Sequence, residues 1–212
     1  RSAGKQEREA LFRKLSNEGY TAASTEIPLI RQSLEDVVAY LAWVLAGIQD
    51  IAADTGFLRL TNAMKEEFQL QKEKIFIYLS LLYDKQAIQQ IRRHIESGNS
   101  QSRIFAMEIS DMMVSQDLKD LFVPVFDDIT VEERLALLKE RFPQYTLSPR
   151  ERLLDIVNAD YSWVNPLIKS YALELMLGIS DTKYLRAMAA NMLCPERIIR
   201  ETAAWVLSHT DK

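Results

Sequence analysis

The octet RETAAWVL, residues 200–207, decides the fold because its pattern returns along the chain. Counted back from Arg200, basic residues stand at successive separations of 31, 35, 31 and 31 residues, at Lys169, Arg134, Arg103 and Lys72. Three positions after each basic residue stands an apolar one: Ala203, Ala172, Leu137, Ala106 and Ile75. A recurrence at roughly 30–35 residues is typical of stacked helical pairs, since one pair alone cannot bury its apolar face.

Apolar residues at three- and four-residue spacing run through nearly every segment, without the period-two alternation that marks strands. The sequence therefore predicts an all-α fold and, more specifically, a HEAT-like helical-repeat solenoid, an α-α superhelix. Glu140 breaks the pattern in the copy that begins at Arg134, where the other copies do not carry a charge. An amphipathic helical protein without repeats also aligns some basic positions by chance, and this alternative stays open.

The start of the chain differs from the rest. Residues 1–29 are expected to form an N-terminal charged helix and a polar linker. Residues 30–212 are expected to form the HEAT-like domain, whose first helices, in residues 30–71, are atypical. Atypical terminal units are usual in solenoids, because the end of a stack has no neighbour to cover it. Long helices are predicted at residues 27–51 and 57–83.

Turn residues agree with this register. Gly98 and Asn99 are suited to a left-handed cap, so they are expected to end a helix. Ser148 is expected to be an N-cap, with Pro149 at the first position of the following helix.

Composition limits the class of protein. Lys and Arg number 26 against 30 Asp and Glu, a net charge of −4, which gives no general attraction to nucleic acid. The single cysteine, Cys194, excludes an internal disulfide, fits a reducing compartment and is interpreted as a small buried residue.

The most apolar run, residues 37–48, is shorter than a membrane span and is interpreted as a buried helix. Because the first residue is Arg1 rather than Met, we expect a longer parent chain.

The residues that usually carry catalysis have no supporting context. His94 and His209 are the only histidines, and neither has a metal-ligand partner at helical spacing. The paired Asp127 and Asp128 lack the dense oxygen series and the glycine of a calcium loop, and they precede a helix start instead. We therefore predict no catalytic, cofactor-binding or metal-binding residue, and we predict that the chain is not an enzyme.

Two features are candidates for an interaction surface. Arg92, Arg93, His94 and Arg103 are close in sequence and suit a small anion or lipid headgroup. The favoured interpretation is solvated helix residues, since Glu96 and the acidic balance offset them. In the long turn DYSWVNP, Trp163 is the best candidate for an exposed aromatic anchor. Packing of this indole in a gap between helices is the favoured alternative.

One segment, residues 72–128, looks more specific than a generic repeat. Its features are Ile75-Phe76 leading to Leu81-Leu82-Tyr83, the Gly98 turn before Arg103, the triplet Ala106-Met107-Glu108, and a stretch from Leu118 ending in Asp127-Asp128. With YALELM at residues 171–176 and the octet, it resembles the soluble HEAT-like region that follows the transmembrane part of some bacterial ATP/ADP translocase-type carriers. These are nucleotide exchange proteins of the major-facilitator kind. The resemblance covers about residues 30–205.

The resemblance also has departures. Asn99 replaces the aspartate common at the HEAT inter-helix turn, the turn at residues 160–166 is extended, and the spacing is shorter than the roughly 40 residues usual for HEAT units. The membrane helices of the carriers have no counterpart in these residues. Their nucleotide-binding positions therefore cannot be carried over, and nucleotide binding is expected only in the absent transmembrane part.

The resemblance implies a non-catalytic HEAT-like domain of an ATP/ADP carrier-type membrane protein that acts as a protein-interaction or regulatory platform. It implies a location at the cytoplasmic face of the inner membrane, and as partner either another protein or the membrane domain of the parent carrier. No nucleic-acid partner is expected. Two alternatives remain: a free-standing helical-repeat scaffold unrelated to transport, and a HEAT-like DNA glycosylase, against which the acidic charge argues.

Overall fold

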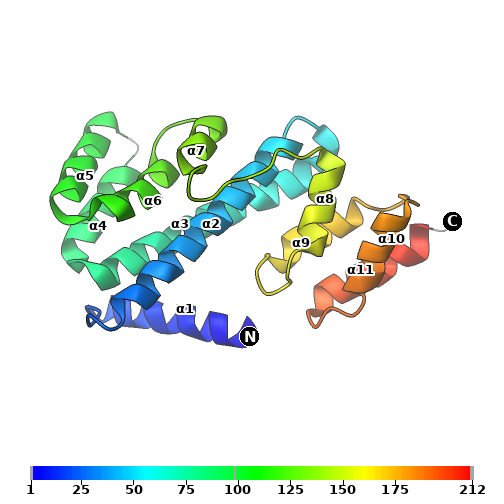
Figure 1. The fold of residues 1–212 in the computed structure, drawn as a ribbon, viewed down its shortest axis with the longest axis horizontal. Coiled ribbons are helices and arrows are strands. Elements are labelled where there is room, and N and C mark those ends of the chain that lie inside the picture. Colours follow the sequence, from blue (N-terminus) through cyan, green and yellow to red (C-terminus); the bar gives the residue numbers. More distant parts are fainter. Residues whose placement is uncertain (1, 98, 211–212) are drawn as a thin grey trace. The chain divides into compact units, whose positions relative to one another are not determined.

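The computed structural model describes residues 2–97 and 99–210, with side chains from residue 7 onward except those of residues 100 and 103. Within these residues all regular secondary structure is helical, eleven α-helices and one short 3₁₀ turn, and no strand occurs (Figure 1). The all-α prediction is confirmed.

The elements follow one another with short connections. In chain order they are α1 (Ser2–Asn17), α2 (Ile27–Ile51), the 3₁₀ turn Thr55–Phe57, α3 (Leu58–Leu82), α4 (Lys85–Glu96), α5 (Ser100–Met113), α6 (Gln116–Phe126), α7 (Val131–Leu138), α8 (Pro149–Asn158), α9 (Pro166–Glu174), α10 (Thr182–Asn191) and α11 (Arg197–Thr210).

Capping side chains set several of these boundaries. Ser148 precedes α8, its side chain accepts a hydrogen bond from the backbone N–H of Glu151, and Pro149 is the first residue of the helix, as predicted. Thr130 and Glu133 form the same reciprocal capping box at the start of α7. The prediction for Asn99 was wrong: its φ is −86°, outside the left-handed region, because its side chain caps the start of α5 instead. Gly98 lies outside the described residues.

The apolar run of residues 37–48 lies inside α2 and is buried, which confirms its interpretation. Across the helices that the structure describes, none combines the length with the apolar character that crossing a bilayer requires.

The chain forms two compact units, and each is built from two separate stretches of sequence. The first unit comprises residues 2–43 and 68–144, and the second comprises residues 44–67 and 145–210. The long helices α2 and α3 therefore contribute residues to both units. The division at residue 30 expected from the sequence rested on repeat character, and it stays a prediction.

In the first unit α1 is attached to α3. Phe12 packs edge-on against Tyr78, with ring centroids 5.7 Å apart, and the carboxylate of Glu9 pairs with the ammonium of Lys74 at 2.6 Å. After α3 the chain forms two helical pairs, α4 with α5 and α6 with α7.

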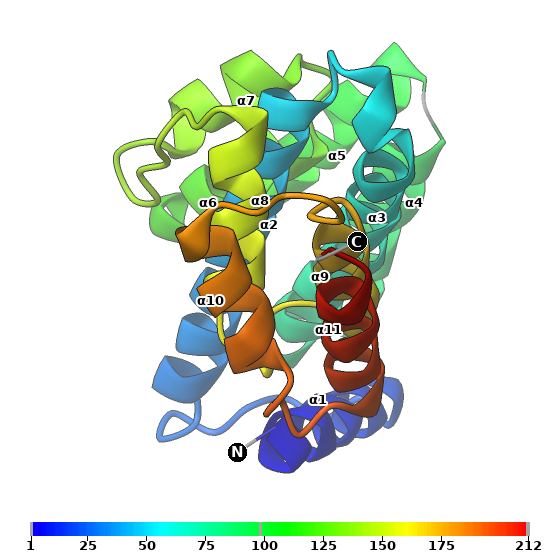
Figure 2. The same cartoon turned by 90° about the vertical axis from the view of Figure 1, so that its right-hand side faces the viewer.

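In the second unit two helical pairs are stacked, α8 with α9 and α10 with α11 (Figure 2). The hydroxyl of Tyr184 donates to the carbonyl of Arg150 at 3.1 Å, which joins the starts of α10 and α8. The amide of Asn191 donates to the carbonyl of Val157 at 3.1 Å, which joins their ends. Helices α8 and α10 are therefore parallel. Both bonds link residues 34 positions apart, close to the separation of 31 residues between Lys169 and Arg200.

The basic residues of the repeated pattern make the same kind of contact in three pairs. In α7, α9 and α11, the side chains of Arg134, Lys169 and Arg200 donate to carbonyls at the end of the preceding helix, those of Pro124 (2.7 Å), Ala159 (2.5 Å) and Cys194 (2.8 Å). The carbonyl of Pro124 is one of those that the end of α6 leaves without an intrahelical partner, and those of Ala159 and Cys194 lie one and three residues beyond the ends of α8 and α10. Burial lowers the pKa of both Arg134 and Lys169. Lys72 differs, because it lies in the middle of α3 and its ammonium is over the rings of Phe68, in the same helix, and Phe126, in α6.

Candidate functional site

The basic cluster predicted on α4 is compensated by acidic partners. Arg92 pairs with Glu73 of α3 and, at 2.6 Å, with Glu96 of its own helix, and its guanidinium lies 5.6 Å from the ring centroid of Phe76. Burial lowers the pKa of Arg92, but the hydrogen bonds and charges of Glu96 and Glu73 outweigh it, so the net shift is upward. The charge of Arg92 is therefore balanced within the chain.

The other members of this cluster do not converge on one point. The guanidinium of Arg93 donates to the carbonyl of Gln89 one turn earlier at 3.3 Å. The ring of His94 lies edge-on to Phe105, with centroids 4.8 Å apart. Arg103 lies in α5, and its side chain is outside the described residues. The described side chains thus give no single anion site, and whether they form an interaction surface stays a prediction.

Trp163 lies in the turn between α8 and α9 and is 36 % exposed. Its backbone N–H donates to the carbonyl of Asp160 at 3.0 Å, and the side chain of Asp160 accepts from the N–H of Ser162 at 2.7 Å. The extended turn is thus held by its own hydrogen bonds. Its role as an anchor also stays a prediction.

A better candidate lies along α9 and α11. A groove of about 600 Å³ is lined by Glu174, Leu177, Glu201, Thr202 and Trp205. We call these five residues the α9–α11 groove. Trp205 is 50 % exposed and Leu177, in the turn after α9, is 44 % exposed. Large apolar side chains are here left in water, which is informative because burial of such groups is the main gain of folding.

The periodicity of the helix explains how the groove arises. Ile199, Ala203 and Val206 face the interior of the unit and are buried. Trp205, between two of them, falls on the opposite side of a helix with 3.6 residues per turn. Leu167 of α9 and Ile198 of α11, which are 31 positions apart, are also exposed and extend the apolar surface along the two helices.

The carboxylates of the groove take part in exposed ion pairs. Glu174 pairs with Arg59 at 3.0 Å, and this guanidinium lies 4.1 Å from the ring centroid of Tyr171. Glu201 pairs with Arg197 one turn away at 2.7 Å. Exposed pairs of this kind contribute only about 0–1 kcal/mol, so a ligand can exchange for either arginine at little cost.

The indole of Trp205 is held by its neighbour one turn on. The ring of His209 stacks on it, with centroids 4.7 Å apart and an angle of 27° between the planes. Nδ1 of His209 lies 2.8 Å from the carbonyl oxygen of Trp205 and 3.0 Å from the hydroxyl of Ser208. These contacts limit the freedom of both rings, which lowers the entropy lost when a partner binds.

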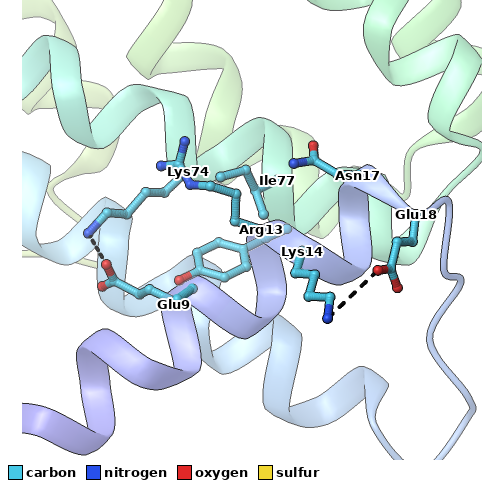
Figure 3. A pocket seen from close by; sticks show the side chains of 9 residues that line it. Glu9, Arg13, Lys14, Asn17, Glu18, Lys74 and Ile77 are labelled. Atoms are coloured by element: carbon cyan, nitrogen blue, oxygen red, sulfur yellow. Dashed lines mark ion pairs between the residues drawn. The ribbon is translucent and has the colours of Figure 1, made fainter.

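A second cavity, of about 560 Å³, lies between α1 and α3 in the first unit. Figure 3 shows two ion pairs among its side chains, Glu9 with Lys74 at 2.6 Å and Lys14 with Glu18 at 4.0 Å, and a further basic residue, Arg13. Tyr78 also lines it, and burial, helped by the charge of Glu9, raises the pKa of this phenol to about 12. Two of the three basic side chains of the lining pair with its two carboxylates, so the cavity carries only a small net charge.

Metal binding finds no support in the described part of the chain, which contains no group of three or more His, Cys, Asp or Glu side chains placed to hold an ion. Cys194 is buried, as predicted.

Sequence reasoning missed the residues of the α9–α11 groove. Trp205 belongs to the octet and Glu174 to the stretch at residues 169–176 that aligns with it, and this alignment by itself gives neither residue a role in binding. A signal was present, because Trp205 stands at a position where the preceding copy has the polar Glu174, 31 residues earlier. A tryptophan at a position that a repeat keeps polar indicates an exposed aromatic ring.

Comparison with known proteins adds no relative. No protein-family model, no curated protein sequence and no solved structure matches this chain.

Proposed function

We propose that this chain is a HEAT-like helical-repeat domain that binds another protein along the α9–α11 groove and performs no catalysis itself. The HEAT-like part is supported by the parallel stacking of α8–α9 on α10–α11 and by the carbonyl contacts of Arg134, Lys169 and Arg200. Stacked helical pairs create extended surfaces that such proteins use for binding.

The observation that carries the binding function is the exposure of Trp205 and Leu177 in one groove. Tryptophan is among the residues that most often dominate the energy of protein interfaces, because a large apolar area is buried with little loss of side-chain entropy. An exposed and already oriented indole is therefore expected to be the anchor of the interface.

Site-specific photocrosslinking tests this function. A benzophenone amino acid is placed at Leu177 in one variant and at Tyr145, which is 84 % exposed and outside the groove, in the other. In cells that make the protein we expect a discrete adduct from position 177 that is lost on Trp205→Ala. An absent adduct, or the same adducts from both positions, would contradict a protein-binding groove.

The carrier assignment rests on the sequence resemblance alone. Under this proposal the domain belongs to an ATP/ADP translocase-type protein at the cytoplasmic face of the inner membrane, and nucleotide is bound by membrane helices. The gene provides the test, because the reading frame is then expected to encode membrane spans ahead of Arg1. A reading frame without them would leave the free-standing helical-repeat scaffold.

A further inference from the structure

We propose that the α9–α11 groove accepts a basic, partly apolar segment of a partner protein, with a lysine or arginine side chain lying against Trp205 between the carboxylates of Glu174 and Glu201. This inference rests on the proposed function and specifies the chemistry of the partner.

The charge of the groove is the first argument. Two of its five lining residues are carboxylates and none is basic. The arginines that now pair with them, Arg59 and Arg197, have side chains 69 % and 80 % exposed, so they are not fixed by burial. A cation from the partner that enters the groove pairs with the same carboxylates in a less hydrated place, where the attraction is stronger.

The indole is the second argument. The face of a tryptophan ring attracts an ammonium or guanidinium group through its quadrupole, and it also covers the apolar stem of a long side chain. A residue with a positive head and an aliphatic stem suits Trp205 better than a purely apolar residue, because its head can also pair with Glu174 and Glu201 while its stem covers the indole. An acidic peptide or a phosphate backbone would bring further negative charge beside Glu174 and Glu201 and would offer them no pairing.

The apolar side chains around the groove indicate what the rest of the bound segment contains. Leu167 and Leu177 lie at opposite ends of the α9 side, and Ile198 lies on the α11 side. The seven helical positions from Leu167 to Glu174, the last residue of α9, cover roughly 10 Å, which an extended peptide crosses in about three residues. The expected ligand is therefore a short segment in which basic and apolar residues alternate, so that each meets the matching part of the surface.

Peptide binding to the full chain tests this chemistry. Three fluorescein-labelled peptides of about eight residues share one pattern of leucines and carry Lys, Gln or Glu at the remaining positions. Fluorescence anisotropy is expected to show binding of the Lys peptide, at least about tenfold weaker binding of the Gln peptide, and none of the Glu peptide.

Variants locate the binding. Trp205→Ala is expected to weaken binding of the Lys peptide by about tenfold or more. Glu174→Gln and Glu201→Gln are each expected to weaken it by about two- to fivefold and to make the binding less dependent on salt. Glu140→Gln removes the same charge from an exposed residue of the first unit and is expected to change nothing. Circular dichroism of each variant checks that the fold is kept.

The outcomes separate this inference from the proposed function. Equal, Trp205-dependent binding of the Lys and Gln peptides would overturn the basic partner and leave a protein-binding groove. Binding of the Lys peptide that none of the three groove variants alters would place it elsewhere and overturn the inference. If no peptide binds, the inference is also overturned. The crosslink from position 177 then still decides whether the groove binds a protein.

Discussion

The buried ion pair of the second unit joins Arg152 at the start of α8 to Asp50 at the end of α2. Their side chains are 3 % and 2 % exposed, and Nε and Nη2 of Arg152 donate to one carboxylate oxygen of Asp50 at 2.9 and 2.6 Å. The same guanidinium donates to Asp155 at 2.7 Å and to the carbonyl of Tyr145 at 3.1 Å. Arg152 therefore fixes the segment that leads into α8.

Replacing Arg152 by alanine is expected to lower the free energy of unfolding by about 3–5 kcal/mol, because the carboxylate of Asp50 stays buried without its charged partner and keeps only the backbone N–H of Leu147, at 3.3 Å. Urea denaturation measures this loss. Arg197→Ala, which breaks an exposed pair with Glu201, serves as the control and is expected to cost less than about 0.5 kcal/mol. Similar losses in the two variants would show that Asp50 finds other partners or water.

The phenol of Tyr78 predicts a pH dependence of stability. The pKa of this phenol is about 12 in the folded protein, against 10.0 for a tyrosine without such contacts. Between pH 10 and pH 12 the folded state therefore keeps a proton that the unfolded state loses. Stability is therefore present below pH 10 and falls as the pH rises toward 12, by at most about 1.4 kcal/mol per unit of pKa difference. Tyr78→Phe is expected to lack this part of the loss, whereas Tyr145→Phe, at an exposed position, keeps it. Parallel curves of unfolding free energy against pH for wild type and Tyr78→Phe would contradict the shift.

How far single residues could be predicted depends on how local their interactions are. The cap Ser148 could be predicted because Pro149 follows it directly, and its hydrogen-bond partner in the structure, Glu151, also lies only three residues away. The pair of Arg152 and Asp50 joins residues 102 positions apart, and no local pattern marks either one. Arg92 looked like part of a basic patch because its acidic partner Glu73 stands on another helix.

The side chain of Met64, in α3, fills the space beside Gly47 of α2. A Cβ atom at this position would collide with the terminal methyl of Met64, which is fully buried. Gly47→Leu is expected to destabilise the protein by about 1–3 kcal/mol, because the added side chain overpacks this contact. Thermal or urea unfolding measures the loss, and adding Met64→Ala to the variant is expected to recover part of it. Strictly additive losses would show that the two residues do not compete for the same space.

The carbonyl contact of Arg134 tests the repeated pattern as an element of structure. Its guanidinium donates to the carbonyls of Pro124 and Asp127, both at 2.7 Å, so it closes the end of α6. Arg134→Met keeps the apolar stem and loses both bonds, for an expected cost of about 2 kcal/mol in urea denaturation. Arg186→Met, at an exposed position of α10, is expected to be nearly neutral. A neutral Arg134→Met would mean that water replaces the cation at the helix end.

The positions of the helices could largely be predicted from the sequence, because apolar residues recur every three to four positions. The bounds of α2, Ile27–Ile51, agree with the predicted range. The prediction for Asn99 failed because asparagine suits both ends of a helix, and only the direction in which its side chain finds a backbone N–H decides between them.

The two interleaved units make a prediction about fragments. A fragment of residues 145–212 lacks Asp50 and Glu67, which Arg152 and the amide of Asn165 contact at 2.6 Å each. We expect it to show little helix by circular dichroism, because its buried polar groups lose their partners. Joining residues 44–67 to it through a flexible Gly/Ser linker is expected to restore helicity. A fragment of residues 145–212 that is fully helical by itself would contradict the interleaved organisation.

This organisation was not accessible from the sequence. The repeat pattern describes neighbours in the chain, whereas the second unit takes residues 44–67 from the middle of two long helices. Nothing in α2 changes in composition between Trp43 and Val44, because both belong to one buried apolar run.

The interleaving also orders events during synthesis. Residues 44–67 leave the ribosome well before residues 145–212, with which they form the second unit. At usual elongation rates the interval is on the order of ten seconds, during which the apolar side chains of the early stretch have no final partner. The nascent chain therefore needs a holding contact, from a chaperone or from its own earlier helices, and a slower ribosome would lengthen the time in which it can aggregate.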